Sequence, residues 1–97
     1  MVSLLGSNNK ASLLCHVFGK VQGVYYRATI RDYALSLQID GWAKNLKNGS
    51  VEIVVAGEHQ SVDKILALLW EGSKDSKVLS ISINKWNDKV KEGFFIE

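Results

Sequence analysis

The chain has 97 residues, of which 46% are hydrophobic and 23% charged, a size and composition typical of one globular domain with a single core. Its net charge of +2 does not indicate a general nucleic-acid surface, and no apolar run approaches the roughly 18 residues needed to span a bilayer. We therefore expect no nucleic-acid and no membrane partner. The N-terminus lacks the basic start and long apolar stretch of a signal peptide, so we expect a cytoplasmic location.

The first residues are polar and irregular, with Ser7-Asn8-Asn9 as their most typical stretch. We predict a flexible arm over residues 1–11 and a single domain over residues 12–97. Leu13–Phe18 is apolar and predicts a strand in which Cys15 is a buried thiol. Because Cys15 is the single cysteine, it can form neither an intramolecular disulfide nor a cysteine metal cluster.

Two segments carry the spacing of a one-sided helix, with apolar residues at i, i+3, i+4 and i+7. These residues are Ile30, Tyr33, Ala34 and Leu37 in the first helix, and Val62, Ile65, Leu66 and Leu69 in the second. The first helix is expected to end before Asp40-Gly41, a turn signal. Ser61 is a candidate N-cap of the second helix, and Gly72 is expected to stop it.

Between the helices, Trp42–Leu46 and Val51–Ala56 are strand candidates. Asn48-Gly49 between them favours a hairpin with a type I′ turn, in which both residues adopt positive φ. After the second helix, Leu79, Ile81 and Ile83 alternate with polar residues as in a half-buried strand, and Phe94–Ile96 is a short final strand.

The resulting order is βαββαβ plus a short terminal strand. It predicts an α+β fold, the ferredoxin-like split βαβ sandwich, with two helices on one face of an antiparallel sheet.

The chain lacks the usual catalytic groups. His16 and His59 fit no metal-ligand spacing, and no nucleophile elbow, Walker-type loop or paired carboxylate is present. We therefore expect no metal and no cofactor. The informative stretch is Gly19 to Arg27, where a loop with glycines joins a strand to a helix, because backbone N–H groups and a helix N-terminus there favour an anion.

Arg27 falls in the first turn of the first predicted helix. A cation there opposes the helix dipole by about 0.3–1 kcal/mol, a conflict that a bound anion would resolve. Its planar guanidinium can hold two phosphate oxygens at once.

Two motifs carry a resemblance to a known family. Gly19-Lys20-Val21-Gln22-Gly23-Val24-Tyr25-Tyr26-Arg27 resembles the acylphosphatase signature Gly-x-Val-Gln-Gly-Val-x-(Phe/Tyr)-Arg. Gly41-Trp42-Ala43-Lys44-Asn45 resembles the second family signature, Gly-aromatic-small-x-Asn, and the resemblance extends from about Leu13 to Ile96.

The resemblance implies an enzyme that hydrolyses the carboxyl-phosphate bond of acyl phosphates without a metal. Phosphate binding is implied for Gly19, Lys20, Val21, Gln22, Gly23, Val24 and Arg27. Arg27 and Asn45 are implied as catalytic, with Arg27 holding the phosphoryl group and Asn45 orienting the attacking water. Inorganic phosphate would be a product and a competitive inhibitor, and the protein is expected to be a monomer.

Other readings stay open at this level. A noncatalytic anion-binding or regulatory module of the same fold would keep the loop and Arg27 without needing Asn45. An acylphosphatase-like part of a larger maturation protein is a related option, which the short chain disfavours. An RNA-recognition domain shares the element order, but Val51–Gly57 contains none of the aromatic residues that such domains use to stack bases.

Overall fold

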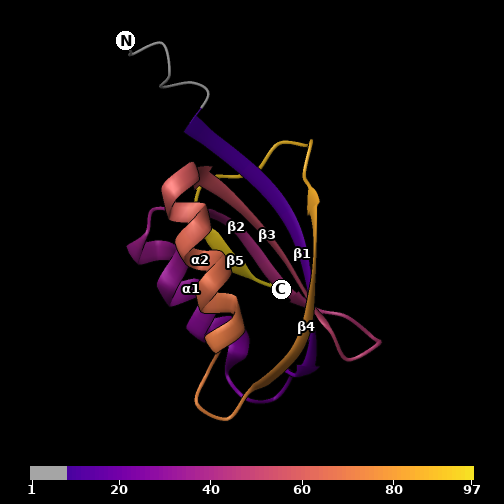
Figure 1. The fold of residues 1–97 in the computed structure, drawn as a ribbon. Helices are drawn as coiled ribbons and strands as arrows, with labels where there is room; N and C mark the ends of the chain where they lie inside the picture. The colour runs from indigo at the N-terminus through magenta and orange to yellow at the C-terminus, as the bar shows by residue number, and fades with distance from the viewer. Residues whose placement is uncertain (1–8) are drawn as a thin grey trace.

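A computed structural model of the chain describes residues 9–97. The elements along the chain are β1 (Lys10–Lys20), α1 (Tyr26–Ser36), β2 (Asp40–Asn45), β3 (Val51–Glu58), α2 (His59–Glu71), β4 (Lys77–Lys85) and β5 (Phe94–Ile96), as Figure 1 shows. This is the predicted βαββαβ order with a short strand at the end. None of the helices among the described residues is long and apolar enough to cross a bilayer.

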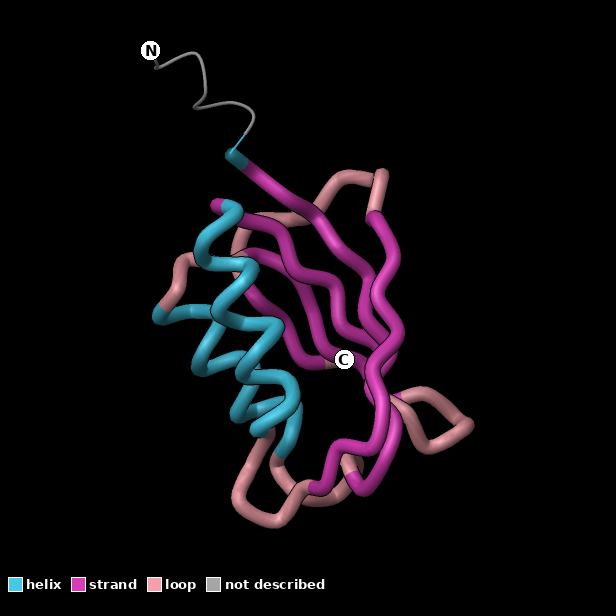
Figure 2. The backbone as a smooth tube through the Cα atoms, viewed as in Figure 1, coloured by secondary structure: helices cyan, strands magenta, loops and turns pink. Residues whose placement is uncertain are grey.

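The strands form one sheet in the order β4-β1-β3-β2-β5, and both helices lie on the same face of it (Figure 2). β1, β2, β3 and β4 pair antiparallel, as expected. The fifth strand adds a parallel contact, because β5 runs alongside β2 and pairs Gly41 with Phe94. The α+β ferredoxin-like prediction is confirmed, with a mixed rather than purely antiparallel sheet.

The core lies between the helices and the sheet. α1 buries Tyr26, Ile30 and Ala34, and α2 buries Val62, Ile65 and Leu69, each at the predicted helical spacing. From the sheet, alternate residues such as Cys15, Val17, Ile53 and Val55 are fully buried against them. Each large apolar side chain buried in this way contributes roughly 1.5–3 kcal/mol of hydrophobic stabilisation.

The hairpin between β2 and β3 is confirmed, but its turn differs from the predicted type I′. Leu46 N–H donates to Ser50 O at 2.9 Å, and Gly49 N–H donates to Leu46 O at 3.1 Å. Gly49 has a φ of 92°, whereas Asn48 is not among the positive-φ residues. The Asn48 side chain instead accepts hydrogen bonds from Ser50 N–H, at 3.0 Å, and from Ser50 Oγ. This side-chain contact organises the turn without positive φ at Asn48.

Two predictions about α2 and β4 were wrong. α2 begins at His59 after Glu58, so Ser61 lies inside the helix rather than at its N-cap; Gly72 ends it as predicted. Leu79 and Ile83 are 69% and 48% exposed, because β4 is an edge strand with a register shift opposite Phe18 and Gly19. Only Ile81 of the predicted apolar face packs against the core.

The arm predicted over residues 1–11 falls mostly on residues 1–8, which lie outside the described part of the chain. Lys10 and Ala11, placed in the arm by the sequence, belong to β1, where they pair with Glu58 and Gly57.

Candidate active site

The loop between β1 and α1, residues 21–25, is held to the β2–β3 hairpin by one side chain. Gln22 Nε2 donates to Leu46 O at 2.8 Å and to Ser50 O at 2.9 Å. On its other side the loop is fixed by Ser73 Oγ, which donates to Val24 O at 2.6 Å. In Figure 1 the loop lies at the bottom of the molecule, and the hairpin projects to the lower right.

The backbone of this loop leaves donors free. Within residues 9–97, the N–H groups of residues 21–25 find no hydrogen-bond acceptor. Gly23 has a φ of 74° and no heavy atom within 4 Å of the place a Cβ would take, so the loop is open there. Unpaired N–H groups in a turn of this kind attract anions.

Helix α1 starts directly after the loop. Tyr25 is its N-cap in the left-handed conformation, with a φ of 61°, and its carbonyl accepts Thr29 N–H at 3.0 Å and Thr29 Oγ1 at 2.9 Å. The first turn of α1 carries no acidic residue, so its positive dipole end is not compensated by a side chain. Arg27 is the second residue of α1, as predicted for the first turn.

Arg27 spans the gap from α1 to the end of β5. Its Nη1 donates to the backbone oxygen of Glu97 at 2.6 Å, and Glu97 N–H donates to Ala43 O at 2.8 Å. Arg27 is thus connected to β2 two residues before Asn45. This is the one hydrogen bond found for the guanidinium within residues 9–97, so its other N–H groups remain available to a ligand.

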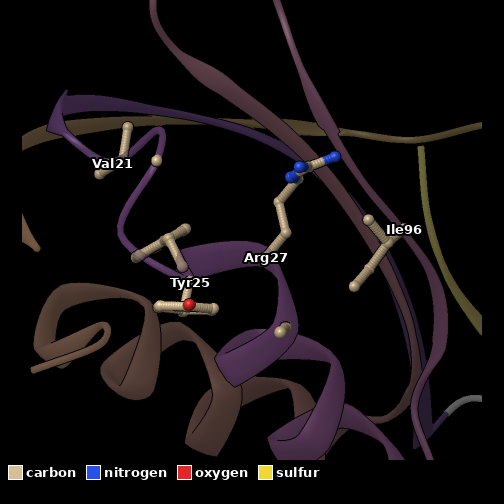
Figure 3. A pocket seen from close by; sticks show the side chains of 7 residues that line it. Val21, Tyr25, Arg27 and Ile96 are labelled. Carbon is tan, nitrogen blue, oxygen red and sulfur yellow. The ribbon is translucent and has the colours of Figure 1, made fainter.

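A hollow of about 310 Å³ lies around Arg27. In Figure 3, Arg27 rises from the start of α1, with Val21 on the loop to one side and Ile96 of β5 to the other. The hollow is lined by Val21, Gly23, Tyr25, Tyr26, Arg27, Ala28 and Ile96.

Asn45 is the last residue of β2 and shares the helix-facing side of that strand with buried Ala43. Its Oδ1 is buried and has no hydrogen-bond partner among the described residues, a condition shared there only by Trp86 Nε1. A buried carbonyl oxygen without a partner is costly, and a ligand or water that donates to it removes that cost.

The structure thus places the loop of the first motif and Asn45, the last residue of the second, at the same end of the sheet, where Gln22 links the loop to the hairpin that follows Asn45. Asn45 itself is not among the residues that line the hollow around Arg27.

Gly19 and Lys20 lie in β1 rather than in the loop. Gly19 has a φ of 135°, and a Cβ there would lie 2.1 Å from Lys77 O, so this glycine permits close pairing with β4. Val21 is buried in the core, and the Gln22 side chain turns to the hairpin.

The anchoring role of the Gln22 side chain was missed from the sequence. The sequence shows only that a glutamine stands in the loop. The backbone oxygens to which it donates lie 24 and 28 residues further along the chain, so the contact has no local pattern.

Three other side chains in the fold, Cys15, Tyr26 and His16, carry reactive groups. Burial raises the pKa of the Cys15 thiol to about 11, which keeps it protonated. Burial, together with the nearby Cys15, also raises the pKa of Tyr26, whose hydroxyl donates to Leu69 O at 2.7 Å. His16 lies on the sheet face away from the helices, 3.7 Å from Glu52. No group of three His, Cys, Asp or Glu side chains within residues 9–97 could hold a metal ion.

The fold defines a class, the small βαββαβ proteins, and in this chain a loop with free N–H groups, the N-terminus of α1 and Arg27 offer donors suited to an anion at one end of the sheet. The family model described as Acylphosphatase matches residues 14–96. The chain is 38% identical over 86 residues to an acylphosphatase of Coxiella burnetii, which covers 89% of this chain and 87% of the relative.

Solved structures agree. An acylphosphatase from Coxiella burnetii superposes with a TM-score of 0.88 at 34% identity, covering 94% of this chain and 96% of that one. An acylphosphatase from Bacillus subtilis gives a TM-score of 0.83 at 30% identity, covering 89% and 97%. The chain belongs to the acylphosphatase family, a family of hydrolases.

Proposed function

We propose that the chain hydrolyses acyl phosphates to a carboxylate and inorganic phosphate, with Arg27 and Asn45 as the catalytic residues. The observation that carries this proposal is the buried Oδ1 of Asn45 at the end of β2, which has no hydrogen-bond partner within residues 9–97 and lies on the strand to which Arg27 is linked through Glu97. An anion site alone would not need that oxygen.

The phosphoryl group would be bound from two sides. The free N–H groups of residues 21–25 and the N-terminus of α1 supply partial positive charge, and the free N–H groups of Arg27 supply a full one. These donors match the charge on the equatorial oxygens of a transferring phosphoryl group, whose transition state needs positioning and electrostatic stabilisation above all.

Asn45 would hold the nucleophile. A water that donates one hydrogen to Asn45 Oδ1 is fixed in orientation, and its lone pair can face phosphorus in line with the bond to the acyl oxygen. As the new P–O bond forms, the bond to the acyl oxygen breaks and its electron pair leaves with the carboxylate. The proton of the water passes to a phosphate oxygen of the substrate.

A carboxylate is a weak base and leaves without prior protonation. This chemistry suits a site without a general acid, and the hydroxyl of Tyr26, which lines the hollow, already donates to Leu69 O at 2.7 Å. No step requires a metal, so we propose a metal-independent reaction that inorganic phosphate, the product, inhibits competitively.

The test is turnover of the purified chain on acetyl phosphate and benzoyl phosphate, with phosphate binding measured on the same sample. We expect saturable release of phosphate from both substrates. Binding of phosphate without any turnover would instead support the noncatalytic anion-binding or regulatory module.

The monomeric state and the cytoplasmic location remain part of the proposal. Light scattering coupled to gel filtration tests the first, and fractionation of cells that express the chain tests the second.

A further inference from the structure

The hollow around Arg27 combines one charged side chain with apolar ones. Arg27 is the only charged residue among those that line it within the described part of the chain, and Tyr25, Ala28 and Ile96 supply apolar surface beside the guanidinium. A ligand that fits such a surface has one anionic end and an uncharged, apolar remainder.

The fold does not explain why Tyr25 carries an aromatic side chain. Its side chain is 84% exposed, although an aromatic ring gains most from burial. Its backbone is in the left-handed region, which costs a residue other than glycine roughly 1–3 kcal/mol. The capping of α1 uses only its carbonyl oxygen, so nothing in the helix start requires an aromatic side chain.

Ile96 faces the hollow from the opposite side. It pairs with Ala43 in the parallel register of β5 and β2, and it is 36% exposed on the helix-facing side of the sheet. The next residue, Glu97, holds Arg27. Apolar surface therefore borders the proposed phosphate site on the side of β5 as well as on the side of α1 (Figure 3).

We propose that Tyr25 and Ile96 bind the acyl group of the substrate, which makes the chain selective for acyl phosphates with an uncharged aromatic or bulky apolar acyl group. The inference rests on the proposed function for the position of the phosphate at Arg27. Once the phosphate engages this guanidinium, no second cation in the lining remains for an acyl group that carries its own negative charge. Acyl phosphates with a negatively charged acyl group are therefore the poorer substrates. Small ones such as acetyl phosphate are also poorer, because they reach little of the apolar surface.

The experiment compares kcat/KM for benzoyl phosphate and acetyl phosphate in wild type, Tyr25→Asn, Tyr25→Phe and Ile96→Ala. Asparagine tolerates the left-handed conformation, so Tyr25→Asn removes the ring without adding backbone strain. Loss of one aromatic contact should lower the benzoyl-to-acetyl ratio about 3- to 10-fold in Tyr25→Asn, mainly through KM for benzoyl phosphate. Tyr25→Phe should retain the wild-type ratio.

Trp70→Ala is the matched control, because Trp70 is a half-exposed aromatic residue on α2 that does not line the hollow. It should leave the ratio unchanged. An unchanged ratio in both Tyr25→Asn and Ile96→Ala, or an equal loss on both substrates, would overturn the acyl-binding role.

Binding of benzoylphosphonate and acetylphosphonate, measured by calorimetry, separates this inference from the proposed function. These compounds cannot be hydrolysed like the substrates, because carbon is bonded directly to phosphorus. If the wild type shows no turnover but binds benzoylphosphonate more tightly, and Tyr25→Asn removes that preference, the proposed hydrolysis fails and the apolar subsite stands. Equal affinity of the wild type for both phosphonates contradicts the subsite, whatever the turnover.

Discussion

Gln22 donates a hydrogen bond from Nε2 to the backbone oxygen of Leu46, 2.8 Å away, and Leu46 directly follows Asn45. The same Nε2 reaches Ser50 O at 2.9 Å, across the hairpin. One side chain thus fixes the distance between the loop that would bind phosphate and the strand end that would hold water.

Gln22→Ala should therefore reduce activity and stability together. Losing two partly buried hydrogen bonds should lower the free energy of unfolding by about 1–3 kcal/mol, measured by urea denaturation. kcat should fall more than the affinity for phosphate, because Arg27 and the helix start remain in place. A stable variant with unchanged kcat would show that the anchor does not position the site.

Arg27→Ala should strongly weaken phosphate binding while preserving the fold, because this side chain makes an exposed contact with Glu97. Loss of a charge-assisted contact to phosphate should weaken affinity by about 2–4 kcal/mol, roughly 30- to 1,000-fold. Arg31→Ala, on the exposed side of the same helix, is the control for net charge. Equal phosphate affinity in Arg27→Ala and Arg31→Ala, by calorimetry, would remove Arg27 from the site.

Substrate chemistry provides a prediction without mutation. Acyl phosphates should be hydrolysed, whereas simple phosphate monoesters should hardly react, because a poor alkoxide leaving group needs a general acid that this mechanism lacks. Activity should also survive dialysis against a chelator. Comparable turnover on both substrate classes would contradict the leaving-group argument, and loss on chelation with recovery on adding a divalent ion would contradict the metal-free reaction.

Cys15 should matter for stability rather than for catalysis. It is fully buried, so Cys15→Ala should cost on the order of 1 kcal/mol of unfolding free energy and leave turnover nearly intact. A hundredfold loss of turnover in a folded variant would assign the thiol a direct role.

The pH dependence of stability checks the burial of this thiol. The folded pKa is raised to about 11 from 9.0, so the stabilisation is present below pH 9 and is lost as the pH rises toward 11. In that range the unfolded chain binds fewer protons, so unfolding becomes easier with rising pH. Cys15→Ala should show a flatter decline in unfolding free energy between pH 8 and 10, and parallel curves for the two proteins would contradict it.

Much of the fold was predictable because its signals are local. The spacing of Ile30 and Ala34, and of Val62 and Ile65, predicts one-sided helices, and both helices bury these residues. The exposure of Leu79 and Ile83 was not predictable, since alternation along a strand does not say which strand lies at the edge of the sheet.

The site also has a part that the sequence predicts and a part that only the tertiary structure shows. Arg27 and Asn45 stand out through their motifs, and in the structure the start of α1 and the end of β2 carry them. The contacts of Gln22 with Leu46 and Ser50, and that of Arg27 with Glu97, join residues up to 70 positions apart. Contacts between residues this far apart in the sequence arise only from the tertiary fold, so no local sequence pattern predicts them.

The central claim is that Asn45 acts on the water and Arg27 on the phosphate. Asn45 Oδ1 is buried without a partner among the described residues, so Asn45→Ala removes an orphaned acceptor and should leave the fold intact by circular dichroism. Asn84→Ala, an exposed asparagine on β4, is the matched control and should behave as wild type.

The decisive measurement is steady-state kinetics on benzoyl phosphate beside phosphate titration, both on the same preparation of Asn45→Ala. An interaction made mainly in the transition state lowers kcat and spares ground-state binding, so kcat should fall by about 100-fold or more while phosphate affinity stays within about twofold of wild type. A wild-type kcat in Asn45→Ala, or a loss of phosphate binding as large as that of Arg27→Ala, would contradict the account.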